Sequence, residues 1–200
     1  MRLLITGSNG LLGQKLVNYC KFEKIDFLAT SLGPNRNSKC SNRQYQSLDI
    51  TNVNEVNQVL TNFNPTHIIN TAALTNVDQC ESESEKCYKI NVLGVVNLLE
   101  YAKTNKCHLQ QISTDFIFDG EKGDYTENDE PNPLSEYGRS KFIAEEKIRT
   151  SGYKDYSIVR TSVVYGVGEN LTKSNIVLWA IDELKKGNTL NIVNDQYRAP

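Results

Sequence analysis

The chain has 200 residues, of which 38% are hydrophobic and 23% are charged, and its formal net charge is −2. This length and composition are typical of one globular domain, or of one domain and part of a second. The near-neutral charge gives no reason to expect nucleic acid or an anionic membrane as a partner, and without a membrane-length apolar run or a signal peptide we expect a cytoplasmic protein.

A glycine-rich turn follows the first predicted strand, residues 3–5. The turn carries Gly7, Gly10 and Gly13, and an amphipathic helix is predicted from Leu11. The first turn of a helix has free N–H groups, and glycines let a pyrophosphate approach the backbone closely. Strand, glycine turn and helix therefore predict a phosphate site. The alternative is a turn that binds nothing, because the glycine spacing differs from the tighter dinucleotide fingerprint.

The second predicted strand, residues 25–30, ends where dinucleotide-binding units normally carry an acid for the ribose hydroxyls of the adenosine. Thr30 and Ser31 stand there instead, and Arg36 follows in a predicted loop. Hydroxyl groups and an arginine suit a 2′-phosphate better than an unmodified ribose. The sequence therefore favours NADPH over NADH, although an arginine in a loop is most often simply solvated.

The third and fourth predicted strands, residues 44–48 and 67–70, flank a helix that we expect Thr51 to cap and Pro65 to end. The third strand leads into two residues that would border an adenine ring, Asp49 and Ile50. The fourth leads into small residues that would let a cofactor lie across the strand end, namely Thr71, Ala72 and Ala73.

A long helix is predicted over residues 84–105, and Asn91 lies within its apolar stretch. A buried asparagine needs hydrogen-bond partners. Two alternatives are open for this side chain: it bonds neighbouring backbone, or it orders water at an active site.

A fifth strand is predicted over residues 109–113, followed by a long polar loop to residue 135, a helix, and a sixth strand over residues 156–160. Long loops in compact domains are usually functional. A last amphipathic helix is expected around residues 174–186. Six strands that alternate with helices predict an α/β fold with a doubly wound, Rossmann-like parallel sheet, whose ligand lies across the carboxyl ends of the strands.

The chain contains five cysteines and two histidines. The cysteines are odd in number and lack paired CxxC spacing, so they are interpreted as reduced, mostly structural thiols. One of the histidines opens an apolar strand, and the sequence therefore predicts no metal site.

The helix after the long loop carries Tyr137 and Lys141, whose four-residue spacing puts a phenol and an ammonium on one helix face. Hydride reduction of a carbonyl creates an alkoxide, which needs a proton from an acid whose pKa is near ambient pH. A cation about 4 Å away can lower the pKa of a tyrosine from about 10 by the required amount. Thr114 follows the fifth strand, so we expect all three side chains at the crevice that the glycine turn opens. The alternative is an ordinary exposed pair and a threonine that caps a turn.

Residues 6–13, Asn91, Thr114 and the pair formed by Tyr137 and Lys141 resemble the extended short-chain dehydrogenases. The resemblance narrows to the dTDP-4-dehydrorhamnose reductase family on four segments, which follow the family order along nearly the whole chain: residues 75–81, 112–120, 131–141 and 160–166.

The resemblance implies that the 4-keto group of a dTDP-sugar takes hydride from NADPH or NADH. Tyr137 would give the proton, Lys141 would hold the nicotinamide ribose and lower the tyrosine pKa, and Thr114 would orient the carbonyl. The expected cofactor-binding residues are Gly7, Asn9, Gly10, Leu11, Leu12, Gly13, Ser31, Arg36, Asp49, Ile50, Thr71, Ala72, Ala73, Asn91, Ser113, Tyr137 and Lys141. The expected substrate-binding residues are Thr75, Asp115, Phe116 and Val163. The expected partners are a nucleotide-sugar substrate and a second copy of the chain in a homodimer.

Two features depart from the family pattern. Val163 stands where many of these reductases have a tryptophan beside the sugar nucleotide. The sequence ends at Pro200, where such enzymes continue into a smaller substrate-holding lobe. We therefore divide it into an NAD(P)-binding Rossmann domain, residues 1–168, and the start of a substrate-binding portion, residues 169–200. If nothing follows Pro200, we expect cofactor binding to survive while turnover is poor or absent.

Two other functions stay open. The regulatory β subunit of methionine adenosyltransferase is similar to these enzymes, and it is a nucleotide-binding partner protein that does not act as a reductase. A nucleotide-sugar epimerase or dehydratase would use the same helix pair. A dehydratase would place an extra acid beside Thr114, and Asp115 is a candidate for it.

Overall fold

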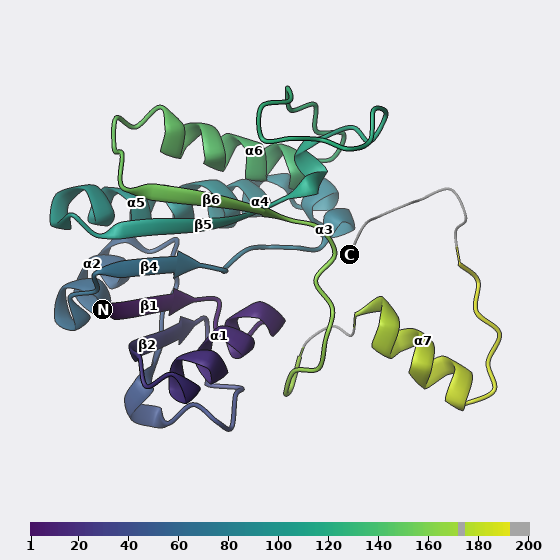
Figure 1. The fold of residues 1–200 in the computed structure, drawn as a ribbon, viewed down its shortest axis with the longest axis horizontal. Coiled ribbons are helices and arrows are strands. Elements are labelled where there is room, and N and C mark those ends of the chain that lie inside the picture. The colour runs from purple at the N-terminus through teal and green to yellow at the C-terminus, as the bar shows by residue number, and fades with distance from the viewer. Residues whose placement is uncertain (172–174, 193–200) are drawn as a thin grey trace.

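The computed structural model describes residues 1–171 and 175–192, and within them six parallel strands form one sheet (Figure 1). The strand order is β3-β2-β1-β4-β5-β6, so the winding direction reverses between β1 and β4. The strands are β1 (Arg2–Thr6), β2 (Asp26–Ser31), β3 (Tyr45–Ser47), β4 (His67–Asn70), β5 (His108–Thr114) and β6 (Tyr156–Thr161). The predicted doubly wound α/β fold is confirmed, and each predicted strand end lies within about one residue of the observed one.

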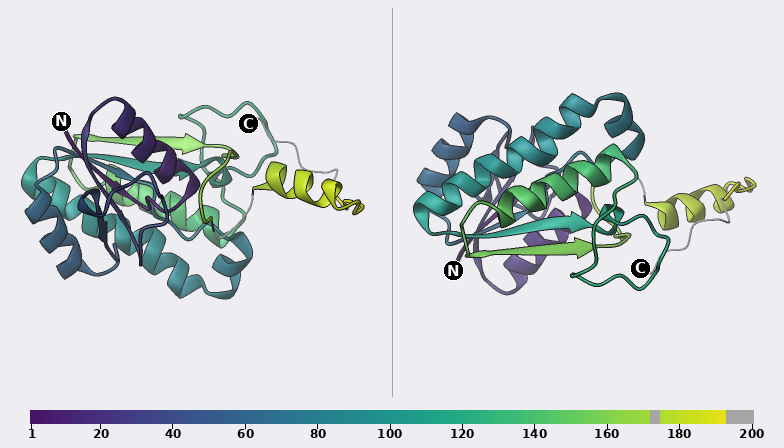
Figure 2. Two further views of the ribbon diagram at one scale, coloured as in Figure 1. Left: turned by 90° about the horizontal axis from the view of Figure 1, so that it is seen from below. Right: turned by 90° about the horizontal axis from the view of Figure 1, so that it is seen from above.

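Helices cover both faces of the sheet (Figure 2). The α-helices of the described residues are α1 (Leu11–Phe22), α2 (Val53–Phe63), α3 (Val77–Ser82), α4 (Ser84–Tyr88), α5 (Gly94–Asn105), α6 (Glu136–Arg149) and α7 (Ile176–Lys185), of which α7 does not pack on the sheet. One face packs Leu3 and Ile5 of β1 against Val17 of α1, and the other packs Leu4 against α2, α5 and α6. Successive side chains of a strand point to opposite faces, which explains why the first apolar run is buried on both sides.

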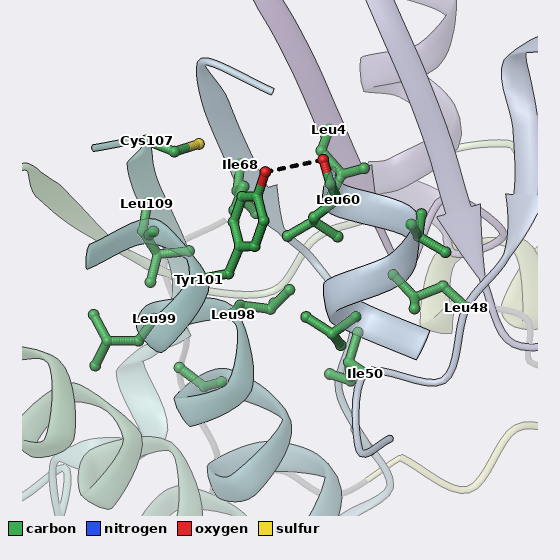
Figure 3. Packing of buried hydrophobic residues seen from close by; sticks show 14 of the residues in the cluster. Leu4, Leu48, Ile50, Leu60, Ile68, Leu98, Leu99, Tyr101, Cys107 and Leu109 are labelled. Carbon is green, nitrogen blue, oxygen red and sulfur yellow. Dashed lines mark hydrogen bonds between the residues drawn. The ribbon is translucent and has the colours of Figure 1, made fainter. Parts of the chain in front are cut away.

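The larger core lies between the sheet and helices α2 and α5 (Figure 3). Leu4, Ile68 and Leu109 come from three neighbouring strands and are fully buried in it. Tyr101 of α5 places its ring in the same core and donates its hydroxyl to the carbonyl oxygen of Leu60 in α2, 2.9 Å away (Figure 3). A buried phenol needs such a partner, so this hydrogen bond joins the two helices and satisfies the hydroxyl at once.

The N-cap of helix α2 differs from the prediction. Asp49 Oδ1 accepts hydrogen bonds from the backbone N (2.9 Å) and the Oγ1 (2.8 Å) of Thr51. The cap is Asn52, whose Oδ1 accepts from the N–H groups of Asn54 (3.1 Å) and Glu55 (3.3 Å). The predicted Thr51 cap is therefore wrong, because the nearby aspartate engages the threonine hydroxyl in a local turn.

The long helix predicted over residues 84–105 is divided. Helix α4 runs into a π-helical turn, Lys89–Leu93, and α5 continues from Gly94. A Cβ added to Gly94 would lie 2.6 Å from the Cδ1 of Ile50, so the helix passes close to the end of β3. Turns of this kind are frequent at functional sites, and this one turns Asn91 into the interior. The sequence does not predict the short helix α3 that comes before it.

Helix α7 lies apart from the rest of the fold (Figures 1 and 2). None of its residues is buried, and Ile176 and Leu184 are more than half exposed. The helix predicted around residues 174–186 is confirmed in its described part, whereas residue 174 and the chain end, 193–200, lie outside the described residues. The division of the chain after residue 168 stays a prediction.

All five cysteines are buried and free of disulfide bonds. Their interpretation as reduced, mostly structural thiols stays a prediction. Within residues 1–171 and 175–192, no helix combines the length and the apolar character that crossing a bilayer requires.

Candidate active site

The glycine turn between β1 and α1 packs against the end of β4. Gly7 has φ +65°, and a Cβ added there would lie 2.5 Å from the backbone N of Ala72. A Cβ added to Gly13 would lie 2.5 Å from the carbonyl oxygen of Gly7. The backbone N of Gly10 donates to that same oxygen at 2.9 Å. The backbone leaves no room for a side chain at Gly7 or Gly13, so packing as well as conformation requires glycine.

Asn9 holds the loop after β2 against the glycine turn. Its Oδ1 accepts a hydrogen bond from the backbone N of Arg36 (2.9 Å), and its Nδ2 donates to the carbonyl oxygen of Pro34 (2.9 Å). Ser31 is the last residue of β2. Asn9, Ser31 and Arg36 consequently line the same cavity as the glycine turn.

Helix α6 begins with a side-chain cap and a close backbone contact. Ser135 Oγ accepts a hydrogen bond from the backbone N of Gly138 at 3.1 Å. A Cβ added to Gly138 would lie 2.2 Å from the carbonyl oxygen of Phe116, in the turn after β5. The rings of Phe116 and Tyr137 meet edge to face, with 5.7 Å between their centroids. This docking brings Tyr137 to the end of β5, where its hydroxyl shares a hydrogen bond with Thr114.

The Tyr137 hydroxyl is a weaker acid than a tyrosine in water. Burial raises the pKa of Tyr137 to about 12, and the hydrogen bond with Thr114 opposes this rise. Thr114 Oγ1 also donates to Oδ1 of Asp115 at 3.2 Å, and the Asp115 carboxylate adds to the rise in the Tyr137 pKa. The expected lowering of this pKa by Lys141 is not found in this structure: burial is the largest cause of the shift, and Lys141 is not among the groups that contribute to it.

Lys141 is buried in α6, and its Nζ donates to the carbonyl oxygen of Ile112 in β5 at 2.6 Å. Burial lowers the pKa of Lys141 to about 8, and Glu145, one helical turn further on, acts in the opposite direction. The ammonium is held by an uncharged backbone oxygen, and it does not offset the effect of burial on Tyr137.

A cavity of about 840 Å³ joins the glycine turn to the tyrosine–lysine pair. It lies at the carboxyl ends of the strands, where parallel α/β sheets bind ligands. Every predicted cofactor-binding residue except Asn91 lines it, and so do Thr114 and Thr75. Three predicted substrate-binding residues do not line it: Asp115, Phe116 and Val163.

Asn91 lies behind the cavity wall. Its Oδ1 accepts from the backbone N of Leu74 (2.8 Å), and its Nδ2 donates to the carbonyl oxygen of Leu74 (3.0 Å) and to Oγ of Ser140 (2.9 Å). Of the two alternatives for this side chain, bonding to backbone is the one observed. Because Ser140 precedes Lys141, Asn91 links the segment after β4 to the helix that carries the lysine.

Gln14 is a site residue that the sequence did not reveal. Its side chain is buried, and its Nε2 donates to the carbonyl oxygens of Asn9 (3.1 Å) and Glu169 (2.7 Å). Its Oε1 accepts from the backbone N of Glu169 at 2.8 Å. A glutamine between the apolar positions of an amphipathic helix normally faces water, so no sequence signal pointed to this role.

The lining of the cavity suits an elongated anionic ligand. Ser113 Oγ is buried and has no hydrogen-bond partner among the described residues, so a polar ligand atom would satisfy it. Arg36 supplies a cation near the glycine turn, and Lys86 and Lys89 supply two more. The two lysines were missed because lysines on a helix usually form a solvated face.

Comparison with known proteins agrees with this geometry. Residues 1–200 match the family model described as the RmlD substrate binding domain. The dTDP-4-dehydrorhamnose reductase of Aggregatibacter actinomycetemcomitans is 37% identical over 201 residues, which are 100% of this chain and 62% of that protein. Methionine adenosyltransferase 2 subunit beta of Bos taurus is 30% identical over 200 residues, which are 100% of this chain and 58% of that protein.

A solved structure of dTDP-4-dehydrorhamnose reductase from Bacillus anthracis, in complex with NADP, superposes with a TM-score of 0.78 at 35% identity. The match covers 92% of this chain and 60% of that chain. The chain therefore spans about three fifths of the length of the relatives that it matches.

Proposed function

Because the chain belongs to the RmlD substrate binding domain family, we propose that it acts as an NAD(P)H-dependent reductase of the 4-keto group of a nucleotide sugar. The observation that carries this proposal is the single cavity that joins the glycine turn to Thr114, Tyr137 and Lys141. Relatives named dTDP-4-dehydrorhamnose reductase support a nucleotide sugar as the substrate.

The chain's own residues fit a dinucleotide. The glycine turn and the free N–H groups of the first turn of α1 would hold the pyrophosphate. Asp49 and Ile50 would border the adenine, and the unpartnered Ser113 hydroxyl would bond a polar group at the nicotinamide end. When bound, the cofactor supplies a hydride.

In the reaction, the Tyr137 hydroxyl would donate its proton to the keto oxygen of the sugar. The Thr114 hydroxyl, which already bonds Tyr137, would hold that oxygen in place. Lys141 would stabilise the tyrosinate that proton transfer leaves behind. Because burial holds the pKa of Tyr137 at about 12, fast transfer at neutral pH requires a stronger effect of Lys141 in the complex than in this structure.

We propose NADPH as the preferred cofactor. Ser31 and Arg36 stand at the end of the cavity where the adenosine ribose would lie, and no acid occupies the end of β2. A guanidinium and a hydroxyl suit a 2′-phosphate. An NADP complex of a relative supports binding of this cofactor class, and titration of the chain with NADPH and NADH tests the preference.

A regulatory role is the second candidate. It rests on relatives named methionine adenosyltransferase 2 subunit beta, of which the bovine protein is 30% identical over the whole chain. The buried Lys141 argues against this role. Burial of an amine that can carry a charge costs free energy, and a protein that only binds a nucleotide gains nothing from that cost. An epimerase or dehydratase on the same fold would retain NAD without consuming it.

The test is to incubate the chain, and any longer natural form of it, with NADPH or NADH and a panel of 4-keto sugar nucleotides. Cofactor absorbance should fall in proportion to the sugar reduced. The proposal is refuted if a form that binds NADPH oxidises it with none of the sugars. Co-purification with an unrelated enzyme would then favour the regulatory role, and tightly held, unconsumed NAD would favour an epimerase.

We also infer a homodimer, from the family resemblance, and we propose the cytoplasmic location that the sequence predicts. Light scattering of the purified chain tests the dimer, and fractionation of cells tests the location. A monomer at all concentrations, or recovery outside the cytoplasm, would contradict the respective inference.

A further inference from the structure

A buried ion pair lies behind the tyrosine–lysine pair. Glu145 of α6 has no exposed surface, and its two carboxylate oxygens accept hydrogen bonds from Nε (3.1 Å) and Nη2 (2.8 Å) of Arg160 in β6. Nη2 of Arg149 lies 3.0 Å from the same carboxylate. Two guanidinium groups therefore surround one buried carboxylate.

Glu145 is also a helical neighbour of Lys141. Residues four apart on an α-helix lie on the same face, one turn from each other. The hydrogen bond that Lys141 makes goes to the carbonyl oxygen of Ile112, which carries no net charge. A buried ammonium needs a negative charge nearby to remain protonated. Glu145 is the buried carboxylate in position to supply it.

We propose that Glu145 is a positioning residue for Lys141: its carboxylate, oriented by Arg160, keeps the lysine amine protonated and in place at the cavity. The inference rests on the proposed function in one respect: a protonated Lys141 matters for catalysis only if it stabilises a tyrosinate, which a neutral amine could not do. The coupling itself is a property of the free protein. It can therefore be measured whatever reaction the chain performs.

The surroundings of Lys141 agree with this role. Burial lowers its pKa, and Glu145 is the first of two groups that raise it. The titratable and charged groups that face Lys141 are Tyr137 and Glu145 on α6, Cys87 on α4 and, behind Glu145, Arg160 on β6 and Arg149 on α6. The removal of the Glu145 charge would therefore leave the ammonium among uncharged groups and two arginines.

Arg160 is itself held in place. Its guanidinium lies over the ring of Phe118, 5.3 Å from the centroid, and its Nη1 donates to the carbonyl oxygen of Glu127 at 3.4 Å. The Phe118 ring stacks on Tyr125, with 4.3 Å between centroids. The long loop after β5 thus orients the arginine that orients the glutamate. The loop therefore has a structural role that does not require contact with the substrate.

The experiment measures the charge of Lys141 directly in the cofactor-free chain. Lysine side chains are labelled with carbon-13, the Lys141 signal is assigned with Lys141→Arg, and the signal is titrated with pH by NMR. Glu145→Gln should lower the pKa of Lys141 by about one unit, because the nearest negative charge is gone and both arginines remain. Arg160→Gln should raise the pKa of Lys141, because a positive charge beside Glu145 is lost while Arg149 still holds the carboxylate in place.

The expected shifts of the Lys141 pKa have opposite signs in the two variants. They therefore distinguish this role from a purely structural ion pair that joins α6 to β6. Loss of such a structural ion pair would admit water and raise the lysine pKa in both variants, and that result overturns the proposal. An unchanged pKa in Glu145→Gln overturns it as well. If Glu145→Gln does not fold, the double variant Glu145→Gln, Arg160→Gln replaces it. The lysine pKa should then be lower in the double variant than in Arg160→Gln alone, and equal values refute the coupling.

Discussion

The two ends of the cavity are built in different ways. At the glycine turn, backbone packs directly on backbone, and Gly7 and Gly13 leave no room even for a Cβ. At the other end, Tyr137 and Lys141 are buried side chains whose pKa values both move in the direction that favours the uncharged form. The glycine-turn end is therefore shaped by steric contacts. The tyrosine–lysine end depends on electrostatics, because burial there disfavours the charged form of each group.

The Tyr137→Phe substitution gives the largest expected effect and tests whether the two ends of the cavity have separate roles. We expect the chemical rate to fall by two or more orders of magnitude, because a general acid is lost. Cofactor affinity should remain nearly unchanged, because the glycine turn is untouched. Steady-state and single-turnover assays, with a cofactor titration as the control, measure both. A wild-type rate in Tyr137→Phe would show that another group donates the proton.

The steric end is tested by Gly13→Ala, whose new Cβ would meet the Gly7 carbonyl oxygen at 2.5 Å. We expect a loss of about 3 kcal/mol in the free energy of unfolding, at the upper end for overpacking. Gly33→Ala is the matched control, because Gly33 has φ +78° and nothing within 4 Å of an added Cβ. It should cost only about 1 kcal/mol. Denaturant unfolding compares them, and equal losses would contradict the steric account.

The electrostatic end is tested by Lys141→Met. The pKa of Lys141 falls from 10.5 to about 8 on folding, so the unfolded chain binds more protons between these pH values. Wild-type stability therefore rises with pH across this window. We expect Lys141→Met to be more stable at neutral pH by an amount on the order of 2 kcal/mol, since it buries no charge but leaves the Ile112 carbonyl unpaired.

This advantage of Lys141→Met should shrink as the pH rises from about 8 towards 10.5. Lys147→Met, on the exposed face of the same helix, is the control and should change stability by less than about 0.5 kcal/mol. Thermal or denaturant unfolding over a pH series measures both variants. A constant difference between wild type and Lys141→Met across that window would contradict the lowered lysine pKa.

The smallest expected effect is on cofactor preference. Arg36→Ala should weaken NADPH binding about tenfold and leave NADH binding unchanged, because only NADPH carries the 2′-phosphate. Lys39→Ala, in the same loop but away from the cavity lining, controls for general charge. Calorimetric titration measures the affinity of each of the two variants for each of the two cofactors. Equal losses for both cofactors would place Arg36 against the pyrophosphate instead.

Much of the fold and the position of the glycine turn could be predicted because they depend on local rules. Apolar strands, a glycine turn and a four-residue spacing are visible in the residues themselves. The N-cap of α2 could not be predicted, because Asp49 binds the N–H and hydroxyl of Thr51 and leaves Asn52 as the cap.

The role of Gln14 could not be predicted either, because its amide bonds the backbone of Glu169, which the fold brings near from a distant part of the chain. For Asn91 the sequence offered bonding to backbone as one alternative, but it did not indicate that the partner is Leu74.

The charge states of Tyr137 and Lys141 were the hardest features to predict. The spacing of Tyr137 and Lys141 correctly indicated one cavity, but it carried no information on how deeply each group is buried. Nor did it indicate that the lysine bonds the Ile112 carbonyl. Burial and hydrogen-bond partners arise from tertiary packing, which helix periodicity does not encode.

The Gln14 amide has a mechanical consequence. Because it bonds the backbone of Glu169 on one side and that of Asn9 on the other, the segment that leads towards α7 is held against the glycine turn. Glu169, which precedes α7 in the chain, is therefore held next to Asn9 of the turn that we propose to bind a dinucleotide.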